Sequence, residues 1–182
     1  MKLNLTPKDM ILIALFSALT GIGAFIKIPI PVVPITLQIV FALMAGIVLG
    51  AKRGMLSQLL YIILGLIGLP VFTSGGGPQY ILSPTFGYLI GMVFASYIVG
   101  KLREGIEEIT ILKLFLISMV GVGVIYIFGL VHLYSIKNLY LGQATSVWDV
   151  LYSGFLLTIV GDIIKAIIVA FTSKKLIYIV NR

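Results

Sequence analysis

Cysteine is absent from this 182-residue sequence, and histidine occurs only once. Disulfides, thiolate metal sites and cysteine nucleophiles are therefore excluded, and so is a histidine-rich metal site. Charge is also scarce, because 10% of the residues are charged, against about 25% in a typical globular chain. With 60% hydrophobic residues the chain cannot coat a water-facing surface. This composition excludes a cytosolic enzyme, a disordered tail and a nucleic-acid reader.

Six hydrophobic segments are suited to cross a bilayer core about 30 Å thick, which needs roughly 20 apolar residues per helix. We place them at residues 10–26, 36–51, 54–69, 83–100, 111–134 and 147–172. The second and third are short and are joined by only Lys52 and Arg53, which predicts a tight helical hairpin. The first lacks a convincing signal-peptide cleavage site, so we expect a retained helix. The sequence predicts an all-α membrane protein, a single bundle of six transmembrane helices forming one domain over residues 1–182.

Lysine and arginine are distributed unevenly between the two sides of these segments. The side with both termini has ten of them: Lys2, Lys8, Lys52, Arg53, Lys101, Arg103, Lys113, Lys174, Lys175 and Arg182. The opposite side has Lys27 and Lys137, and Lys165 lies within a segment. Because cytoplasmic loops are enriched in basic residues, we expect both termini in the cytoplasm. The net charge of +7 then reflects membrane topology, and nucleic acid is not an expected partner.

The first of two unusual loops on the expected outer side covers residues 28–38. It contains Pro29, Pro31 and Pro34, and proline favours an extended backbone in its own and the preceding residue. We therefore expect this loop to lie across the outer face and to deliver Gln38 to the top of the second helix.

The second unusual loop, residues 69–80, contains three consecutive glycines, Gly75 among them. Glycine lets the backbone approach another group closely. One interpretation is a flexible connection between two helices. The other is a lid over a small amphipathic ligand, since Phe72, Gln79 and Tyr80 flank the glycines and a simple connection does not need them.

Two charged residues, Asp162 and Lys165, lie within the sixth segment. Each costs about 2.5–3.5 kcal/mol to place inside a membrane helix. A spacing of three puts them on one helical face, where they can neutralise each other. The pair either fixes helix packing or anchors a ligand in a cavity, and we favour the second because apolar residues pack at lower cost. Asp162 lies about 20 Å from the outer end of the helix, so a deep cavity, a strong tilt or a late helix start must bring it within reach.

Small residues recur at a spacing of four: Ala14 and Ala18, Gly46 and Gly50, Gly87 and Gly91. Such pairs let membrane helices approach closely. We interpret the glycine pairs as packing within the bundle. The alanine pair lies on the cytoplasmic half of the first helix and suits packing within the bundle or contact with a partner subunit equally well.

Several motifs of transport and catalysis are missing. The sequence has no P-loop, so the chain cannot power transport by hydrolysing ATP itself. A single histidine excludes a zinc HExxH motif, no TVGYG filter occurs, and no nucleophile–base set is visible. We therefore expect no enzyme, no cofactor and no metal.

Four motifs together resemble the BioY family, the biotin-binding S components of energy-coupling factor (ECF) transporters. They are PVVPITLQ at residues 31–38, GLPVF at 68–72, SPTFGYLIG at 83–91 and GDIIK at 161–165. The resemblance spans the whole chain and implies six helices in this order. It implies a high-affinity receptor for biotin in the cell membrane, which docks on a transmembrane coupling subunit (T component) driven by two cytoplasmic ATPase subunits. It also implies that Ala14 and Ala18 meet the coupling subunit.

The resemblance further implies that biotin is held by Asp162 and Lys165 together with residues of the outer loops. Asp162 is suited to accept hydrogen bonds from the ureido N–H groups, and Lys165 to donate to the ureido oxygen or to the valerate carboxylate. Glutamine suits either end of the ligand, and aromatic rings suit its thiophane ring and aliphatic tail. The full set of substrate-binding residues that we predict is Gln38, Phe72, Gly75, Gln79, Tyr80, Tyr88, Asp162 and Lys165.

Two other functions stay open at this point. An S component for another vitamin, of the thiamine or riboflavin type, would share the architecture but not the ligand. A free-standing carrier that uses an ion gradient through Asp162 would need no ATPase at all.

Overall fold

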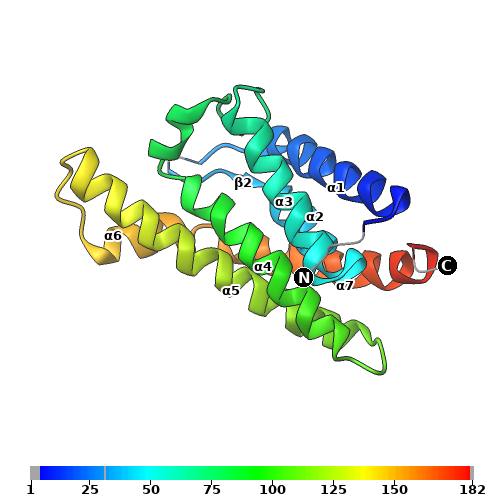
Figure 1. Ribbon diagram of the computed structural model, residues 1–182. Coiled ribbons are helices and arrows are strands. Elements are labelled where there is room, and N and C mark those ends of the chain that lie inside the picture. The colour runs from blue at the N-terminus through cyan, green and yellow to red at the C-terminus, as the bar shows by residue number, and fades with distance from the viewer. Residues whose placement is uncertain (1–4, 31, 181–182) are drawn as a thin grey trace.

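The chain folds into a bundle of helices, in a computed structural model that describes residues 5–30 and 32–180 (Figure 1). Lys2, Pro31 and Arg182, which entered the predictions above, lie outside this part. The α-helices are α1 (Pro7–Phe25), α2 (Gln38–Leu49), α3 (Ala51–Leu66), α4 (Phe86–Glu104), α5 (Ile111–Ser135), α6 (Val147–Leu151) and α7 (Ile159–Val180). Shorter elements are strands β1 (Lys27–Ile28) and β2 (Ile35–Thr36), the 3₁₀ helix η1 (Pro78–Leu82), and the π-helical segments η2 (Ile136–Tyr140) and η3 (Tyr152–Leu156).

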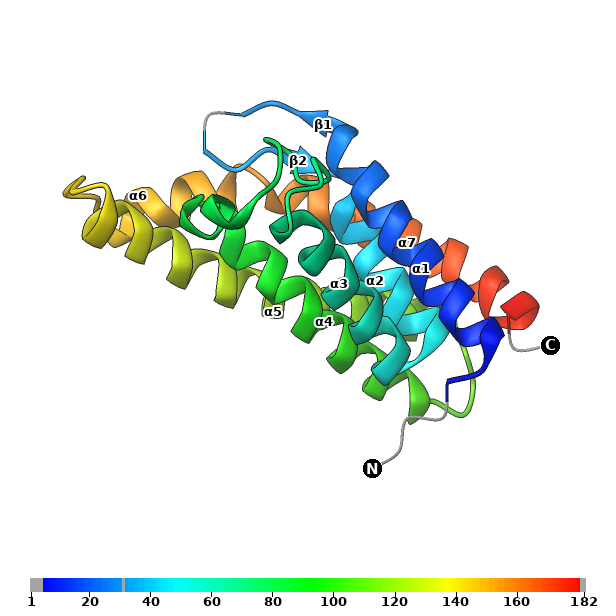
Figure 2. The same cartoon turned by 45° about the horizontal axis from the view of Figure 1, so that its top comes forward.

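Helix α2 forms the centre of the bundle and contacts α1, α3, α4 and α7. Ten of its 12 residues are buried, as expected for a helix that is hydrophobic on all sides. Helix α5 packs on α4 and α7 and, with η2 and α6, extends far beyond the other helices at one end of the molecule (Figures 1 and 2). The strands β1 and β2 pair antiparallel, with Lys27 opposite Thr36.

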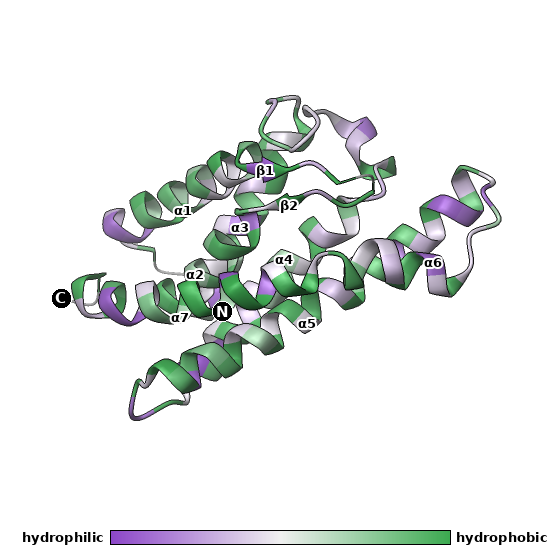
Figure 3. Ribbon diagram, turned by 180° about the vertical axis from the view of Figure 1, so that it is seen from behind, coloured by the Kyte–Doolittle hydropathy of each residue, from purple (hydrophilic) through white to green (hydrophobic). Residues whose placement is uncertain are grey.

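Helices occur in all six segments expected from the sequence, but some of these helices are long and apolar enough to cross a membrane and others are not. In the part of the chain that the structure describes, three stretches are long and apolar enough to cross a membrane, namely Pro7–Phe25, Ile111–Tyr140 and Val147–Val180. Hydrophobic residues cover most of the length of the long helices, and hydrophilic residues lie mainly toward their ends (Figure 3). Helix α2, with 12 residues, spans about 18 Å, which is well short of a bilayer core of about 30 Å.

The predicted connection between α2 and α3 was wrong in its detail. Lys52 and Arg53 do not form a loop but lie in the first turn of α3, which begins at Ala51. The chain reverses at Gly50 alone, whose φ of +85° is a conformation that residues with a Cβ rarely adopt. The hairpin is therefore even tighter than the basic pair suggested.

The interpretation of the glycine pairs as packing positions is confirmed for Gly46, Gly87 and Gly91, but it is wrong for Gly50, which makes the turn between α2 and α3. A Cβ on Gly46 would lie 2.2 Å from the backbone oxygen of Ser96 on α4, and one on Gly91 would lie 2.8 Å from the Cα of Ile125 on α5. Helix backbones thus meet directly at these points, which only glycine permits.

Replacing Gly46 by alanine is expected to destabilise the bundle by about 1–3 kcal/mol, because the added methyl group has to push two backbones apart. Thermal unfolding in detergent measures the effect. Gly123 is the matched control, since it is exposed on α5 and a Cβ there meets nothing within 4 Å. Gly123→Ala is expected to be neutral or slightly stabilising. Equal unfolding temperatures for Gly46→Ala and Gly123→Ala would contradict this account of the α2–α4 contact.

Polar contacts join the helix ends at one end of the bundle, where α1 begins and α7 finishes (Figure 2). The Lys8 ammonium donates to the Val180 carbonyl at 2.7 Å, and Arg53 pairs with Asp9 at 2.5 Å. Glu104 accepts from the backbone N–H of Ala51 at 2.9 Å and from Lys101 at 3.0 Å. Basic residues that are far apart in the sequence therefore gather on one side of the molecule.

Candidate functional site

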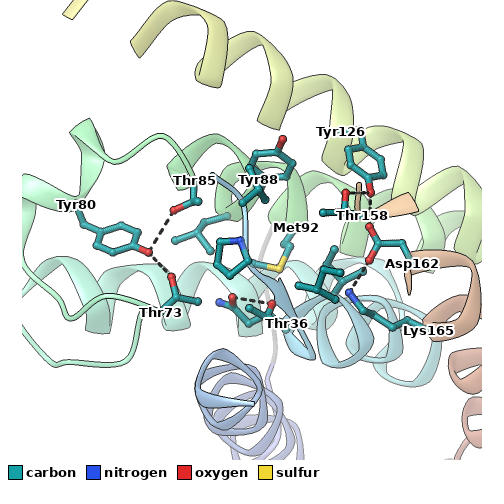
Figure 4. Close-up of a pocket in the computed structure, with 16 residues that line it drawn as sticks. Thr36, Thr73, Tyr80, Thr85, Tyr88, Met92, Tyr126, Thr158, Asp162 and Lys165 are labelled. Carbon is teal, nitrogen blue, oxygen red and sulfur yellow. Dashed lines mark hydrogen bonds and ion pairs between the residues drawn. The ribbon is translucent and has the colours of Figure 1, made fainter. Parts of the chain in front are cut away.

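A cavity of about 50 Å³ lies between α2, α4, α5 and α7, beneath the two unusual loops (Figure 4). We call it the inner cavity. Residues 33–36 and Thr73 cover it from the loops. Its helix-borne lining is Gln38, Ile39, Tyr80, Thr85, Tyr88, Leu89, Met92, Tyr126, Thr158, Asp162 and Lys165. It thus combines a mainly apolar wall with two separate polar groups.

The first polar group is built around Asp162, which is 2% exposed. Its Oδ1 accepts a hydrogen bond from the Lys165 ammonium at 2.6 Å, and Lys165 is 5% exposed. Its Oδ2 accepts from the Tyr126 hydroxyl, which also lies 2.6 Å from Thr158 Oγ1. The predicted ion pair is therefore confirmed, and two hydroxyls extend it. Since a buried carboxylate needs partners, this network keeps a charged acceptor at the cavity wall.

Of the three ways to bring Asp162 within reach, a late helix start does not apply, because Val147–Val180 is one helical stretch with a local irregularity at residues 152–158. Helix α6 passes into the π-helical segment η3, and regular α-helix resumes only at Ile159. Thr158 Oγ1 contacts the backbone carbonyls of Gly154 and Phe155, a competition that interrupts regular helix. Asp162 follows this irregularity directly, and its backbone N–H donates to the Thr158 carbonyl at 3.1 Å.

Gln38 is buried at the start of α2 and lines the inner cavity, as predicted. Its Oε1 accepts from Thr36 at 3.1 Å and its Nε2 donates to the Tyr61 hydroxyl at 2.7 Å. Tyr61 in turn donates to the Val71 carbonyl at 3.0 Å. The amide thus connects the cavity wall to α3 and to the glycine-containing loop.

The second polar group consists of hydroxyls on the opposite side of the cavity (Figure 4). The Tyr80 hydroxyl lies 2.7 Å from Thr73 Oγ1 and 3.3 Å from Thr85 Oγ1. Tyr88 lines the cavity between the two groups, and its hydroxyl donates to the Gly154 carbonyl at 3.0 Å. Tyr80 therefore contributes its hydroxyl to the polar lining of the cavity, whereas the hydroxyl of Tyr88 is bonded to a carbonyl outside the lining.

Three other predicted residues are not among those that line the inner cavity. Phe72 is buried against Gly65, where a Cβ would lie 2.0 Å from its ring, and it packs on the rings of Tyr61 and Tyr80. Gly75, with φ of +111°, closes a turn by pairing with Phe72. Gln79 is exposed and donates to the Gly76 carbonyl at 2.7 Å. These residues shape the loop, and its threonine, Thr73, is the one that faces the cavity.

Sequence reasoning missed several polar members of the lining: Thr36, Thr73, Thr85, Tyr126 and Thr158. Thr158 carried a usable signal, since it precedes Asp162 by four residues and so shares its helical face. Tyr126 carried none, because it is one of several aromatic residues on α5 and meets Asp162 only through the packing of α5 on α7.

Ala14 and Ala18 are exposed on α1, together with Ile11 and Leu15. They contribute to a hydrophobic surface of the molecule, and α1 supplies no residue to the inner cavity. Ser17 and Thr20 of the same helix are buried instead, and Thr20 receives a hydrogen bond from the buried Gln58 of α3 at 3.2 Å.

Comparison with known proteins agrees with this fold. The sequence model of the BioY family matches residues 1–182. The probable biotin transporter BioY of Lysinibacillus sphaericus is 45% identical over 168 residues, which cover 92% of this chain and 86% of that protein. The biotin transporter BioY of Thermotoga maritima is 36% identical over 171 residues, 93% and 95% of the two chains.

A solved structure gives the same result for the fold. The crystal structure of the S component for biotin from an ECF-type ABC transporter matches with a TM-score of 0.84 and 30% identity. The match covers 97% of this chain and 94% of that chain. By sequence and by structure, the chain therefore belongs to the BioY family.

Proposed function

We propose that this chain is the biotin-binding subunit of an ECF-type vitamin transporter. The observation that carries the proposal is the buried Asp162–Lys165 pair with the Tyr126 hydroxyl, set in the wall of the inner cavity. Relatives named as biotin transporters and a fold shared with a biotin S component support the choice of ligand. Membership of a transporter family also agrees with the expectation that the chain is not an enzyme.

The membrane arrangement that we propose has all six helical segments embedded as one domain, with both termini in the cytoplasm. Three stretches have the length and apolarity to cross by themselves, and α2 and α3 are carried within the bundle by their contacts to longer helices. The hydrogen bond from Lys8 to Val180 supports termini on one side. Arg53 and Lys101 gather at that same end, which suits the cytoplasmic enrichment of basic residues.

For the ligand, we propose contacts from five of the predicted residues: Gln38, Tyr80, Tyr88, Asp162 and Lys165. Biotin offers two ureido N–H donors, and a carboxylate is the strongest acceptor that a protein has for them. Asp162 meets that need. Phe72 and Gly75 act indirectly by holding the loop that presents Thr73, and Gln79 belongs to the same loop.

Biotin binding has to enlarge the inner cavity. Its volume of about 50 Å³ is far below the roughly 300–1,000 Å³ of small-molecule sites. The covering residues 33–36 are held by a strand pair of only two residues on each side, whereas the helical walls are closely packed. We therefore expect residues 33–36 to move outward when the ligand enters.

The partners that we propose are a transmembrane coupling subunit and two cytoplasmic ATPase subunits, with the lipid bilayer around them. The chain has no P-loop, so energy has to come from other subunits. The exposed Ala14 and Ala18 on α1 suit close contact with a helix of the coupling subunit.

Calorimetric titration of the detergent-purified chain tests the ligand. We expect near-stoichiometric binding of biotin with a dissociation constant of about 1–10 nM, which corresponds to roughly −12 to −11 kcal/mol. Desthiobiotin, thiamine and riboflavin are titrated in parallel. Binding of thiamine or riboflavin in place of biotin would overturn the proposed ligand. Absence of binding by all four, in protein shown to be folded, would favour an ion-coupled carrier.

A further inference from the structure

A second cavity, which we call the outer cavity, lies between the two unusual loops. Its volume is about 270 Å³. The residues that line it come from both loops and the positions beside them and are Lys27, Pro29, Ile30, Val32, Pro34, Thr73, Ser74, Ser83, Pro84 and Thr85. The inner cavity holds about 50 Å³. The outer cavity is therefore the larger of the two. None of the substrate-binding residues predicted from the sequence is among those that line it.

The two cavities adjoin. Pro34, Thr73 and Thr85 line both of them, so the outer cavity opens onto the same loop residues that cover the inner one. Thr73 and Thr85 are also the two partners of the Tyr80 hydroxyl, as Figure 4 shows. A ligand that reaches Asp162 from the expected outer side has to pass these hydroxyls, and the outer cavity lies directly before them.

The outer cavity carries one positive charge, Lys27. Its ammonium donates to the Thr73 carbonyl at 2.7 Å, and since an ammonium has three N–H donors, donors are left for a ligand. No acidic side chain lines the outer cavity among residues 5–30 and 32–180. The hydroxyls of Ser74, Ser83 and Thr85 line it as well and add neutral donors. Lys165, by contrast, is already paired with Asp162.

We propose that the outer cavity is an encounter site for the carboxylate of the incoming vitamin, with Lys27 as its positive charge. The ligand binds there first through its charged tail and then moves past Thr73 and Thr85 into the inner cavity. This inference rests on the proposed function and adds to it a second, transient site. The ammonium of Lys27 also forms the hydrogen bond to Thr73 that joins the two loops.

The test measures the association and dissociation rates of tritiated biotin by rapid mixing and filter capture. Lys27→Gln is expected to slow association about fivefold at about 0.01 M ionic strength, where charges act over about 30 Å, and much less at about 0.15 M. Its dissociation rate is expected to fall by about the same factor, so that the dissociation constant stays unchanged, because the charge of Lys27 eases passage in both directions and does not contact the ligand in the final complex. Lys27→Arg keeps the charge and is expected to restore fast association.

Two controls test whether the slower association depends on the carboxylate of the ligand and on the position of Lys27. Biotin methyl ester has no carboxylate, so its association, followed by competition with labelled biotin, is expected to be the same in Lys27→Gln and the wild type. Lys137, the other basic residue on the expected outer side, lies on η2 away from both cavities, and Lys137→Gln is expected to leave the association rate unchanged.

Three results would overturn the encounter site. They are an unchanged association rate in Lys27→Gln, equal slowing for the methyl ester, or an effect confined to dissociation, which would put Lys27 in the final complex instead. Wild-type protein that does not bind biotin would contradict the proposed function itself, and this is seen before any variant is compared.

Discussion

Replacing Asp162 by asparagine is expected to weaken biotin binding by roughly 10- to 150-fold. Hydrogen bonds to a charged group contribute about 1.5–3 kcal/mol, and the amide can neither accept as strongly nor balance the buried Lys165. The dissociation constant is measured by calorimetry, and thermal unfolding of the same preparations is measured beside it. An unchanged affinity in folded protein would remove Asp162 from the site.

Stability has to be separated from binding in this variant, because an unpaired buried ammonium destabilises a protein by about 3–5 kcal/mol. The double variant Asp162→Asn/Lys165→Met removes both charges. It is expected to recover most of the stability and none of the affinity. If its affinity returned to the wild-type value, the ion pair would serve packing alone. Asp149→Asn is the matched carboxylate control, since Asp149 only caps α6 together with Ser146.

Replacing Ala14 by tryptophan is expected to leave biotin affinity unchanged and to reduce assembly with the coupling subunit about tenfold or more. Ala14 is exposed on α1, which supplies no residue to the inner cavity. A large ring there would keep a partner helix from approaching closely, and overpacking of such contacts costs about 1–3 kcal/mol. Copurification of tagged chain with coexpressed coupling and ATPase subunits measures the complex.

Gly123→Trp supplies the control for bulk and hydrophobicity. Gly123 is also a small exposed residue, but it lies on α5, and a Cβ there meets open space. This variant is expected to bind biotin and to assemble normally. Normal copurification of Ala14→Trp would show that α1 is not the docking surface, and equal losses in both variants would point to a general effect of the tryptophan.

In the two unusual loops, the sequence alone did not predict which side chains face the cavity. Phe72 and Thr73 are adjacent, and the sequence favoured the aromatic residue as the ligand contact. In the structure Phe72 packs on Gly65 and Tyr61, and Thr73 faces the cavity. The turn closed by the Phe72–Gly75 pairing decides which of the two points inward. No local pattern distinguishes these orientations, because they depend on how α3 packs beneath the loop.

The hairpin of α2 and α3 shows that the exact ends of the helices were also not predictable from the sequence. Lys52 and Arg53 looked like a connection because they are the polar residues between two apolar runs. They are helical because Gly50 alone reverses the chain, and charged side chains are tolerated at a helix end that meets polar partners, as Arg53 meets Asp9. Polarity thus marked the end of the bundle correctly but not the residue that makes the turn.

The sequence by itself determined the helical class, the uneven distribution of basic residues and the Asp162–Lys165 pair. These properties depend on hydrophobic area and on spacing within one helical turn, which are local. Only the tertiary structure decided that the Tyr126 hydroxyl completes the Asp162 network, that Asp162 lines the inner cavity, and that a larger cavity lies beside it. The physical reason is that these features arise from side-chain packing between segments far apart in the chain, such as α5 on α7 and one loop on the other.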